Sequence, residues 1–231
     1  MSAVLARSAT HRPGAAWVAA AVLAGLTLLL GGCAGTTSAE DRPVADVRIH
    51  DGDALAHGAV LPTPYRVPSA PLTGTDGRPH DLARDAQAPL TLVFFGYTSC
   101  PDICRLVMAG IASGLTRLDA SHRGRVDMAF VTTDPARDTP RVLRSYLDRY
   151  DPRFSGLTGS LSSIKRLGTA VGVPIAHGRR LASGGYDVSH GTQVVGMLPD
   201  GRAPFVWTAG TSPGGLADDL TAILDGEVPL T

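Results

Sequence analysis

The chain has 231 residues, 44% of them hydrophobic, which is enough apolar material for one ordinary domain with a buried core. Its 21 basic and 21 acidic residues give a formal net charge of zero, and both signs are interspersed along the sequence. This balance argues against a nucleic-acid-binding protein, which needs a clustered basic surface.

The first 32 residues have the pattern of an export signal rather than of a folded domain. Arg7 and Arg12 precede an apolar stretch at residues 15–30, which is short for a membrane span. The stretch ends in Leu30-Gly-Gly-Cys33, which resembles the lipobox of bacterial lipoproteins. We therefore predict a signal peptide at residues 1–32, acylation of Cys33, and a lipid-anchored protein on the extracytoplasmic face of the bacterial cell membrane. An ordinary secretory signal or an uncleaved anchor is the alternative.

Residues 33–60 are predicted to form a flexible membrane tether. They are rich in Gly, Thr, Ser, Ala, Asp and Pro and show no sustained periodicity. The remaining residues, 61–231, are predicted to form one folded domain.

Strand and helix patterns alternate through this domain. Residues 65–82 contain short apolar pieces around Thr75-Asp-Gly-Arg78, a turn sequence that predicts a β-hairpin. Continuous apolar runs predict buried strands, and apolar residues at helical spacing predict helices. The further elements expected are a strand at 90–97, a helix at 104–118, a strand at 126–132, a helix starting at Thr139 and Pro140, a short strand at 154–157, a helix capped by Ser160, a long loop at 174–191, a hairpin of 192–198 and 203–208, and a helix at 216–224.

This order of elements predicts an α/β fold with a mixed central sheet, helices on both faces and an N-terminal β-hairpin. Two thiols follow the first central strand at the start of a helix, which makes the arrangement thioredoxin-like. Three residues separate these thiols, whereas redox folds of this type usually have two between them.

Cys100 and Cys104 lie where the strand ends and the helix begins. If the helix starts near Asp102, Cys104 lies in its first turn, where unsatisfied N–H groups and the helix dipole favour a thiolate. With Cys33 acylated, these are the remaining thiols, and an oxidising compartment favours a disulfide, a bound metal or a cycle between the two. The spacing puts helical Cα atoms about 6 Å apart, which favours a soft metal without excluding disulfide exchange.

A histidine is the expected third ligand, because two thiolates suit Cu(I) and an added imidazole would let the site hold Cu(II). His190 is preferred to His177 because it immediately precedes the strand predicted from residue 192, which would fix its reach. Zinc is a weaker alternative, because structural zinc needs four ligands. Met108 is interpreted as core filling rather than as a ligand. Solvated surface positions are predicted for His50, His57, His80 and His122.

Several motifs together resemble the Sco/SenC family of membrane-tethered, thioredoxin-fold copper chaperones for the binuclear copper centre of cytochrome c oxidase. These motifs are Cys100-Pro-Asp-Ile-Cys104, Asp134-Pro-Ala-Arg-Asp-Thr-Pro140, Gly156-Leu-Thr-Gly159, Asp187-Val-Ser-His190 and Pro199-Asp-Gly201. The resemblance covers roughly residues 72–224. It implies that Cys100, Cys104 and His190 are copper ligands and that the two cysteines can form a reversible disulfide.

Two positions depart from the family pattern. Arg105 stands where the family usually has Pro, and its charge would favour deprotonation of the thiols. Ser189 stands where the family usually has Asp, which removes a carboxylate that could orient His190. Asp134 and Asp138 match the family motif, and we interpret them as turn and N-cap residues in preference to residues that support the site or contact a partner.

Three functions compete on these observations. The first is a copper metallochaperone, not strictly an enzyme, whose partner is the copper-bearing oxidase subunit or another copper chaperone. The second is a thiol–disulfide oxidoreductase that keeps the copper-ligand cysteines of that subunit reduced. The third is a lipid-tethered binding module with an inert disulfide. A disulfide that closes so short a loop would add little stability, which counts against this function. A peroxidase is a minor alternative, since Thr98 precedes Cys100 by two residues but Pro101 and the second cysteine do not match.

Overall fold

The computed structural model describes the backbone of residues 55–180 and 186–228, and the side chains of these residues except 177–180 and 186–190. The predicted signal peptide, Cys33 and most of the predicted tether lie outside the described residues. The packed chain begins before the predicted boundary at residue 61, because Leu55 is only 5% exposed and the first strand starts at Ala59. None of the helices in the described part of the chain is long and apolar enough to span a bilayer.

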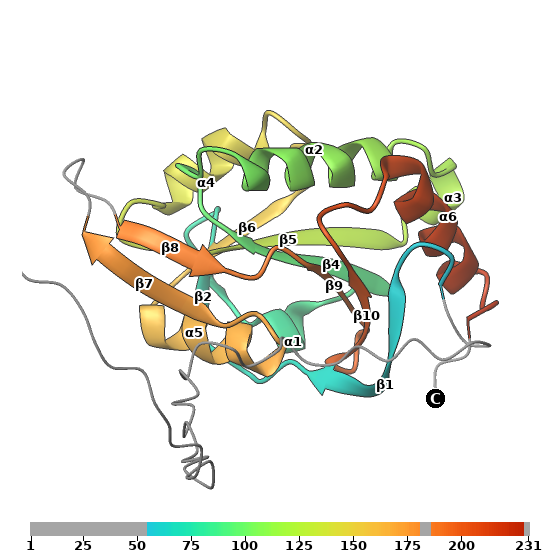
Figure 1. Ribbon diagram of the computed structural model, residues 1–231, viewed down its shortest axis with the longest axis horizontal. Helices are drawn as coiled ribbons and strands as arrows, with labels where there is room; N and C mark the ends of the chain where they lie inside the picture. The colour runs from blue at the N-terminus through green and yellow to red at the C-terminus, as the bar shows by residue number, and fades with distance from the viewer. Residues whose placement is uncertain (1–54, 181–185, 229–231) are drawn as a thin grey trace, which may run out of the picture. The chain divides into compact units, whose positions relative to one another are not determined.

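A mixed sheet of eight strands forms the centre of the domain (Figure 1). Its strands are β1 (Ala59–Arg66), β2 (Leu72–Gly74), β3 (Pro79–His80), β4 (Leu90–Gly96), β5 (Val126–Thr132), β6 (Ser155–Thr158), β9 (Val194–Met197) and β10 (Arg202–Trp207). They lie in the order β1-β10-β9-β4-β5-β6-β2-β3. The pairs β4–β5 and β5–β6 are parallel, and β9 runs antiparallel to β4. The predicted mixed central sheet is therefore confirmed.

Helices cover both faces of this sheet, as predicted. They are α1 (Leu82–Asp85), α2 (Ile103–Leu115), α3 (Ala120–Arg123), α4 (Pro140–Leu147), α5 (Leu161–Ala170) and α6 (Pro213–Leu224). Figure 1 shows α2, α4 and α6 on one face and α1 and α5 on the other. The predicted N-caps are present: the Thr139 hydroxyl accepts from the Val142 N–H, and Ser160 accepts from the Ser163 N–H.

Alternation along the central strands divides the apolar residues between two cores. Leu92 and Phe94 of β4 pack with α2, α4 and α6, whereas Val93 and Phe95 pack with α1 and α5. Because both faces are covered, β4 is a continuous apolar run in which every residue is buried. This explains why the strand could be recognised without an alternating pattern.

Both predicted hairpins are present. Strands β2 and β3 pair around Thr75–Arg78, with Gly77 at a φ of 77°, and β9 pairs with β10 across a turn in which Gly201 also has a φ of 77°. Such positive φ values are costly for residues with a side chain, so glycine is suited to both turns.

The predicted loop at 174–191 is wrong. Strands β7 (Ile175–Arg180) and β8 (Tyr186–His190) pair antiparallel in a separate two-stranded sheet. This segment is rich in Gly, Arg and Ser and lacks the apolar run that identifies a buried strand. Its strands are specified by pairing with each other, which a search for apolar periodicity does not detect.

The start of the described chain is hydrogen-bonded to α6. The buried Asp219 carboxylate accepts from the Trp207 indole N–H at 2.8 Å and from the His57 backbone N–H at 3.2 Å. Gly215 leaves room for the imidazole, because a Cβ there would lie 2.5 Å from the Cγ atom of His57. The backbone of His57 is therefore attached to the domain, while its side chain is exposed, as predicted for a surface histidine.

His122 joins α3 to the end of α6. Its Nδ1 atom lies 2.7 Å from an Asp119 carboxylate oxygen, and its Nε2 atom lies 3.0 Å from one of Asp225. The hydrogen bonds to Asp225 and Asp119 raise the pKa of His122 above its ordinary value of 6.5. The prediction of a merely solvated surface residue is therefore wrong.

This arrangement predicts a pH-dependent contribution to stability. A raised folded-state pKa stabilises the fold fully below the unfolded pKa of 6.5, and the contribution is lost as the pH rises through the folded value. We expect His122→Gln to lower the free energy of unfolding more at about pH 5.5 than at about pH 9. Urea unfolding of both proteins at the two pH values measures this difference, and an equal loss at both would contradict it.

Candidate metal centre

The two cysteines flank the junction between β4 and α2. The Cys100 N–H donates to the Tyr97 carbonyl at 3.1 Å, which closes a tight turn after the strand. Helix α2 begins at Ile103, and Asp102 at its N-cap position makes no side-chain cap. Instead, the Cys100 sulfur accepts from the Cys104 N–H at 3.4 Å, and so satisfies one amide of the first turn. The fold thus brings the two predicted cysteine ligands together.

Both cysteines are thiols and both are buried, with Cys100 7% exposed and Cys104 fully covered. Burial is the main reason that the pKa of Cys104 rises to about 12, and a hydrogen bond with the Cys100 side chain raises it further. The expectation that the helix start would favour a thiolate at Cys104 is therefore wrong in the metal-free protein, because burial outweighs it. A metal bound there must displace a proton.

Predictions were made for two further side chains near the thiols, Arg105 and Met108. Arg105 is exposed, and its guanidinium donates to the Pro101 carbonyl. The pKa of Cys104 is raised despite this nearby charge, because burial is the largest influence on it. Met108 is fully buried in the core between the sheet and α2, which confirms that it fills the core.

The loop after β5 lies against the cysteine turn. The Asp138 carboxylate does not cap α4, whose N-cap is Thr139; it accepts hydrogen bonds from Thr98. Our interpretation of Asp138 as an N-cap residue is therefore wrong. Asp134 forms an ion pair with Arg137, whose guanidinium carbon lies 5.9 Å from the centre of the Tyr97 ring.

His190 is placed by its backbone. It is the last residue of β8 and pairs with Ile175 of β7. Val194, four positions later, lies opposite Phe94 near the carboxyl end of β4. Because each residue spans at most about 3.6 Å, the His190 backbone is held within about 14 Å of Val194, at the edge of the sheet from which the cysteine turn leaves.

The third ligand itself stays a prediction. The side chains of His190 and His177 are not among those described, and Ser189 is placed only by its pairing with Ala176. Among the side chains that the structure does describe, no group of three His, Cys, Asp or Glu residues is arranged to hold a metal ion. The two thiols are therefore the described part of the site, and their chemistry fits a soft metal such as Cu(I).

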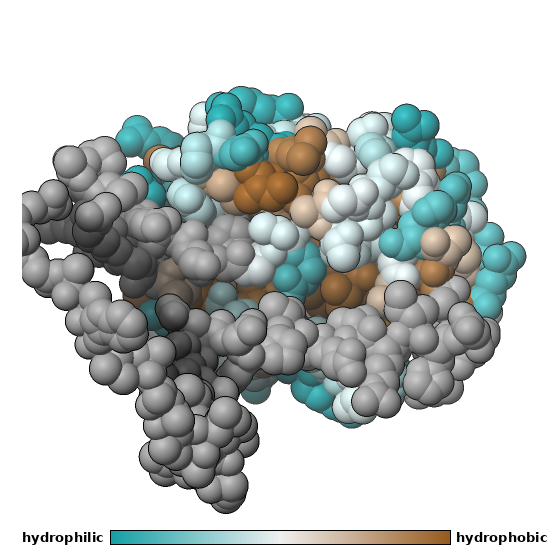
Figure 2. All heavy atoms as spheres, in the orientation of Figure 1, coloured by the Kyte–Doolittle hydropathy of each residue, from teal (hydrophilic) through white to brown (hydrophobic). Residues whose placement is uncertain are grey.

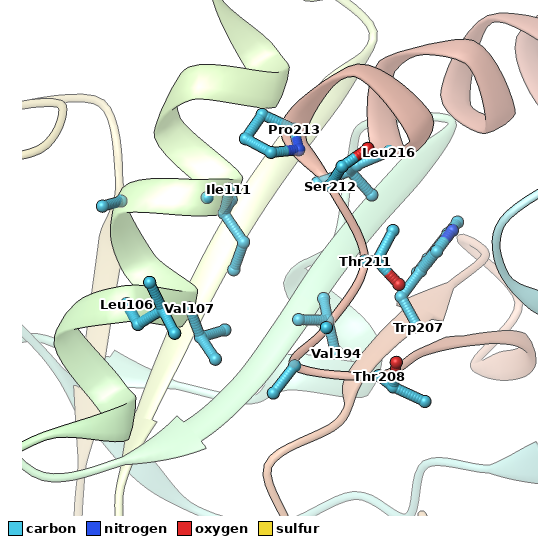
Figure 3. A pocket seen from close by; sticks show the side chains of 14 residues that line it. Leu106, Val107, Ile111, Val194, Trp207, Thr208, Thr211, Ser212, Pro213 and Leu216 are labelled. Carbon is cyan, nitrogen blue, oxygen red and sulfur yellow. The ribbon is translucent and has the colours of Figure 1, made fainter.

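An apolar groove of about 440 Å³ adjoins the helix that carries Cys104 (Figure 3). Its walls are α2, with Leu106, Val107 and Ile111, and the segment that leads from Trp207 into α6. Leu106 is 62% exposed, and Figure 2 shows hydrophobic side chains gathered over α2 on this face. An open apolar surface thus begins two residues after Cys104.

Comparison with known proteins identifies the family. The SCO1/SenC family model matches residues 70–225, which is most of the chain. The chain belongs to the SCO1/SenC family. A protein of Stutzerimonas stutzeri that is named for copper binding is 33% identical over 172 residues, which cover 74% of this chain and 83% of the relative.

Two further relatives agree with this assignment. The copper-bound structure of Bradyrhizobium japonicum ScoI is 29% identical with a TM-score of 0.60, and covers 68% of this chain and 98% of that chain. Mitochondrial SCO2 of Saccharomyces cerevisiae is 29% identical over 140 residues, or 61% of this chain, but the match spans only 44% of the yeast protein. The thioredoxin-like fold predicted from the order of elements and the place of the dithiol is confirmed for this SCO1/SenC protein.

The contact between Thr98 and Asp138 could not be predicted from the sequence. Thr98 and Asp138 are 40 residues apart, and no spacing rule joins them. Each belongs to a separate local motif, the turn before Cys100 and the Asp-Thr-Pro start of α4. Only the parallel pairing of β4 with β5 brings the two strand ends side by side.

Proposed function

We propose that this protein binds copper through Cys100, Cys104 and His190 and delivers it to the copper-bearing subunit of cytochrome c oxidase. The observation that carries the proposal is the buried dithiol at the start of α2 in a chain of the SCO1/SenC family. Sco proteins are a family of cytochrome c oxidase assembly proteins. Copper is the cargo in this reaction, so the site must bind it and also release it.

The chemistry of the described groups supports a copper cargo. Thiolates are soft ligands that select Cu(I), and the buried position of Cys104 protects the pair from solvent. An imidazole from His190 would add a ligand that also suits Cu(II). The backbone of His190 is anchored near the carboxyl end of β4, which supports this assignment.

The protein is further proposed to act on the extracytoplasmic face of the cell membrane, anchored through lipid on Cys33. The lipobox-like sequence before Cys33 and the polar segment that follows it support this location. The copper-bearing oxidase subunit, or another copper chaperone, is then the partner that meets the site outside the cytoplasm.

The test uses the reduced soluble chain from residue 44 onward, with Cu(II) added without oxygen. We expect a visible thiolate-to-copper charge-transfer band that is lost or strongly shifted in His190→Ala. His177→Ala is the matched control, because it removes a histidine from β7, the strand that pairs with β8, and should leave the band unchanged. An unchanged spectrum of His190→Ala would remove His190 from the ligand set.

A thiol–disulfide oxidoreductase is the second candidate function. The hydrogen bond between the Cys104 and Cys100 side chains favours it, because it places the two sulfurs close together. In this reaction one thiolate attacks a substrate disulfide and expels one substrate thiol. The other cysteine then attacks the mixed disulfide, so the substrate gains two electrons and Cys100–Cys104 becomes a disulfide. A wild-type dithiol that exchanges with glutathione but forms no copper band would favour this function.

A further inference from the structure

The Asp138 carboxylate is fully buried, yet it lies on the loop between β5 and α4. One of its oxygens accepts from the Thr98 hydroxyl at 2.6 Å. The other accepts from the Thr98 backbone N–H at 3.0 Å and from the Thr132 hydroxyl at 2.6 Å. A buried carboxylate is tolerated when such donors satisfy it, so this arrangement is specific and not a chance surface contact.

Two of these three hydrogen bonds hold the turn that carries the thiols. Thr98 precedes Cys100 by two residues, inside the turn that the Cys100 N–H closes on Tyr97. Both hydrogen-bond donors of Thr98, the N–H and the hydroxyl, are bound by one carboxylate. A two-point attachment of this kind restricts both the position and the rotation of the turn.

We propose that Asp138 is a positioning residue that sets the geometry of Cys100 and Cys104 through Thr98. The chain of contacts is short. Asp138 fixes Thr98, the turn carries Cys100, and the Cys100 sulfur accepts from the Cys104 N–H at the start of α2. The inference rests on the proposed role of the two thiols as a copper-binding or redox pair.

The fold does not depend on this attachment alone. The Thr133 N–H donates to the Gly96 carbonyl at 2.6 Å, and the Thr133 hydroxyl donates to the same carbonyl at 3.2 Å. These bonds join the ends of β4 and β5 without Asp138. Removing the Thr98 hydroxyl should therefore loosen the turn without unfolding the domain.

Thr98 and Thr132 provide a matched pair of variants. Each donates a 2.6 Å hydrogen bond to the same carboxylate, but only Thr98 lies in the cysteine turn. Thr98→Val and Thr132→Val each replace a hydroxyl by a methyl group and leave the charge of Asp138 in place. Thr132→Val also removes the acceptor of the Asp134 N–H, so it should be at least as destabilising.

We expect Thr98→Val in the full-length chain, purified in detergent, to lower the Cu(I) affinity by about 10–100-fold, the usual cost of losing a residue that supports a ligand. Competition with a coloured Cu(I) chelator measures this. The equilibrium between dithiol and disulfide, measured against glutathione without copper, should shift by about tenfold or more as well. Thr132→Val should leave both quantities within about threefold, and Thr98→Ser, which keeps the hydroxyl, should restore both.

Equal effects of Thr98→Val and Thr132→Val on the site would overturn the proposal, because they would reflect general destabilisation. Wild-type values of both quantities in Thr98→Val would also overturn it. If the wild-type protein binds no Cu(I), the proposed copper function fails, while the redox equilibrium still tests the positioning role of Asp138.

Discussion

Replacing Cys104 with alanine is expected to lower the Cu(I) affinity by more than about 100-fold, beyond the usual cost of losing a supporting residue. Cys104 is a fully buried thiol beside Cys100, and its loss leaves a single sulfur ligand among the described residues. Chelator competition under reducing conditions measures the affinity. Thermal unfolding of the metal-free variant verifies that the fold is kept.

Met108→Leu is the matched control for this variant. It also removes a buried sulfur from α2, but Met108 packs in the core and a leucine of similar volume can replace it. We expect its Cu(I) affinity to stay within about threefold of wild type. Equal losses in the two variants would show that packing, and not ligation by Cys104, controls binding.

The Cu(I) affinity is also expected to depend on pH. Because the pKa of Cys104 is raised to about 12, its thiol holds a proton at neutral pH and must release it when copper binds. Each released proton makes the apparent affinity rise about tenfold per pH unit. Cys104→Ala should therefore reduce the pH dependence of binding by about one proton, measured between about pH 6 and pH 8.

The largest expected loss of stability comes from Phe130→Ala. Phe130 is fully buried in β5, with its ring centre 6.0 Å from that of Phe94 and 5.5 Å from that of Tyr146. Removing the ring should lower the free energy of unfolding by about 3–5 kcal/mol, because apolar contacts are lost and a cavity remains. For a domain of this size, that corresponds to a fall in Tm of roughly 10 °C.

Leu106→Ala is the control for this prediction. Leu106 is exposed on α2, so its truncation should change the free energy of unfolding by less than about 0.5 kcal/mol. Urea unfolding of the two variants measures the contrast. A loss below about 1 kcal/mol for Phe130→Ala would mean that the layer between α4 and the sheet is less tightly packed than described.

Much of the fold was predictable because its signals are local. The apolar runs of β4 and β5, the caps Thr139 and Ser160 and the turn glycines Gly77 and Gly201 each act within a few residues. Such features depend on backbone preferences and on burial, both of which the residue types specify. The exceptions include β7 and β8, whose polar strands are defined by pairing with each other, and β1, which pairs with β10 and was not predicted.

The candidate site was likewise predictable in its local features and not in those that depend on packing. The two cysteines were predictable because their spacing and their place after a buried strand are features of adjacent residues. Their protonation was not, because the helix start and the degree of burial act in opposite directions on the pKa of Cys104. Only the packing of α2 on the sheet makes that thiol fully covered, and burial then dominates.

By itself, the sequence determined the alternation of the central strands and helices, the dithiol at the start of α2 and the family to which the chain belongs. The tertiary structure decided which distant residues support those thiols. Parallel pairing of β4 and β5 brings Asp138 to Thr98 across 40 positions, and antiparallel pairing of β9 with β4 leads the chain after His190 to the same edge. Contacts of this kind depend on strand order and register, which the whole sheet sets and which no local pattern of residues encodes.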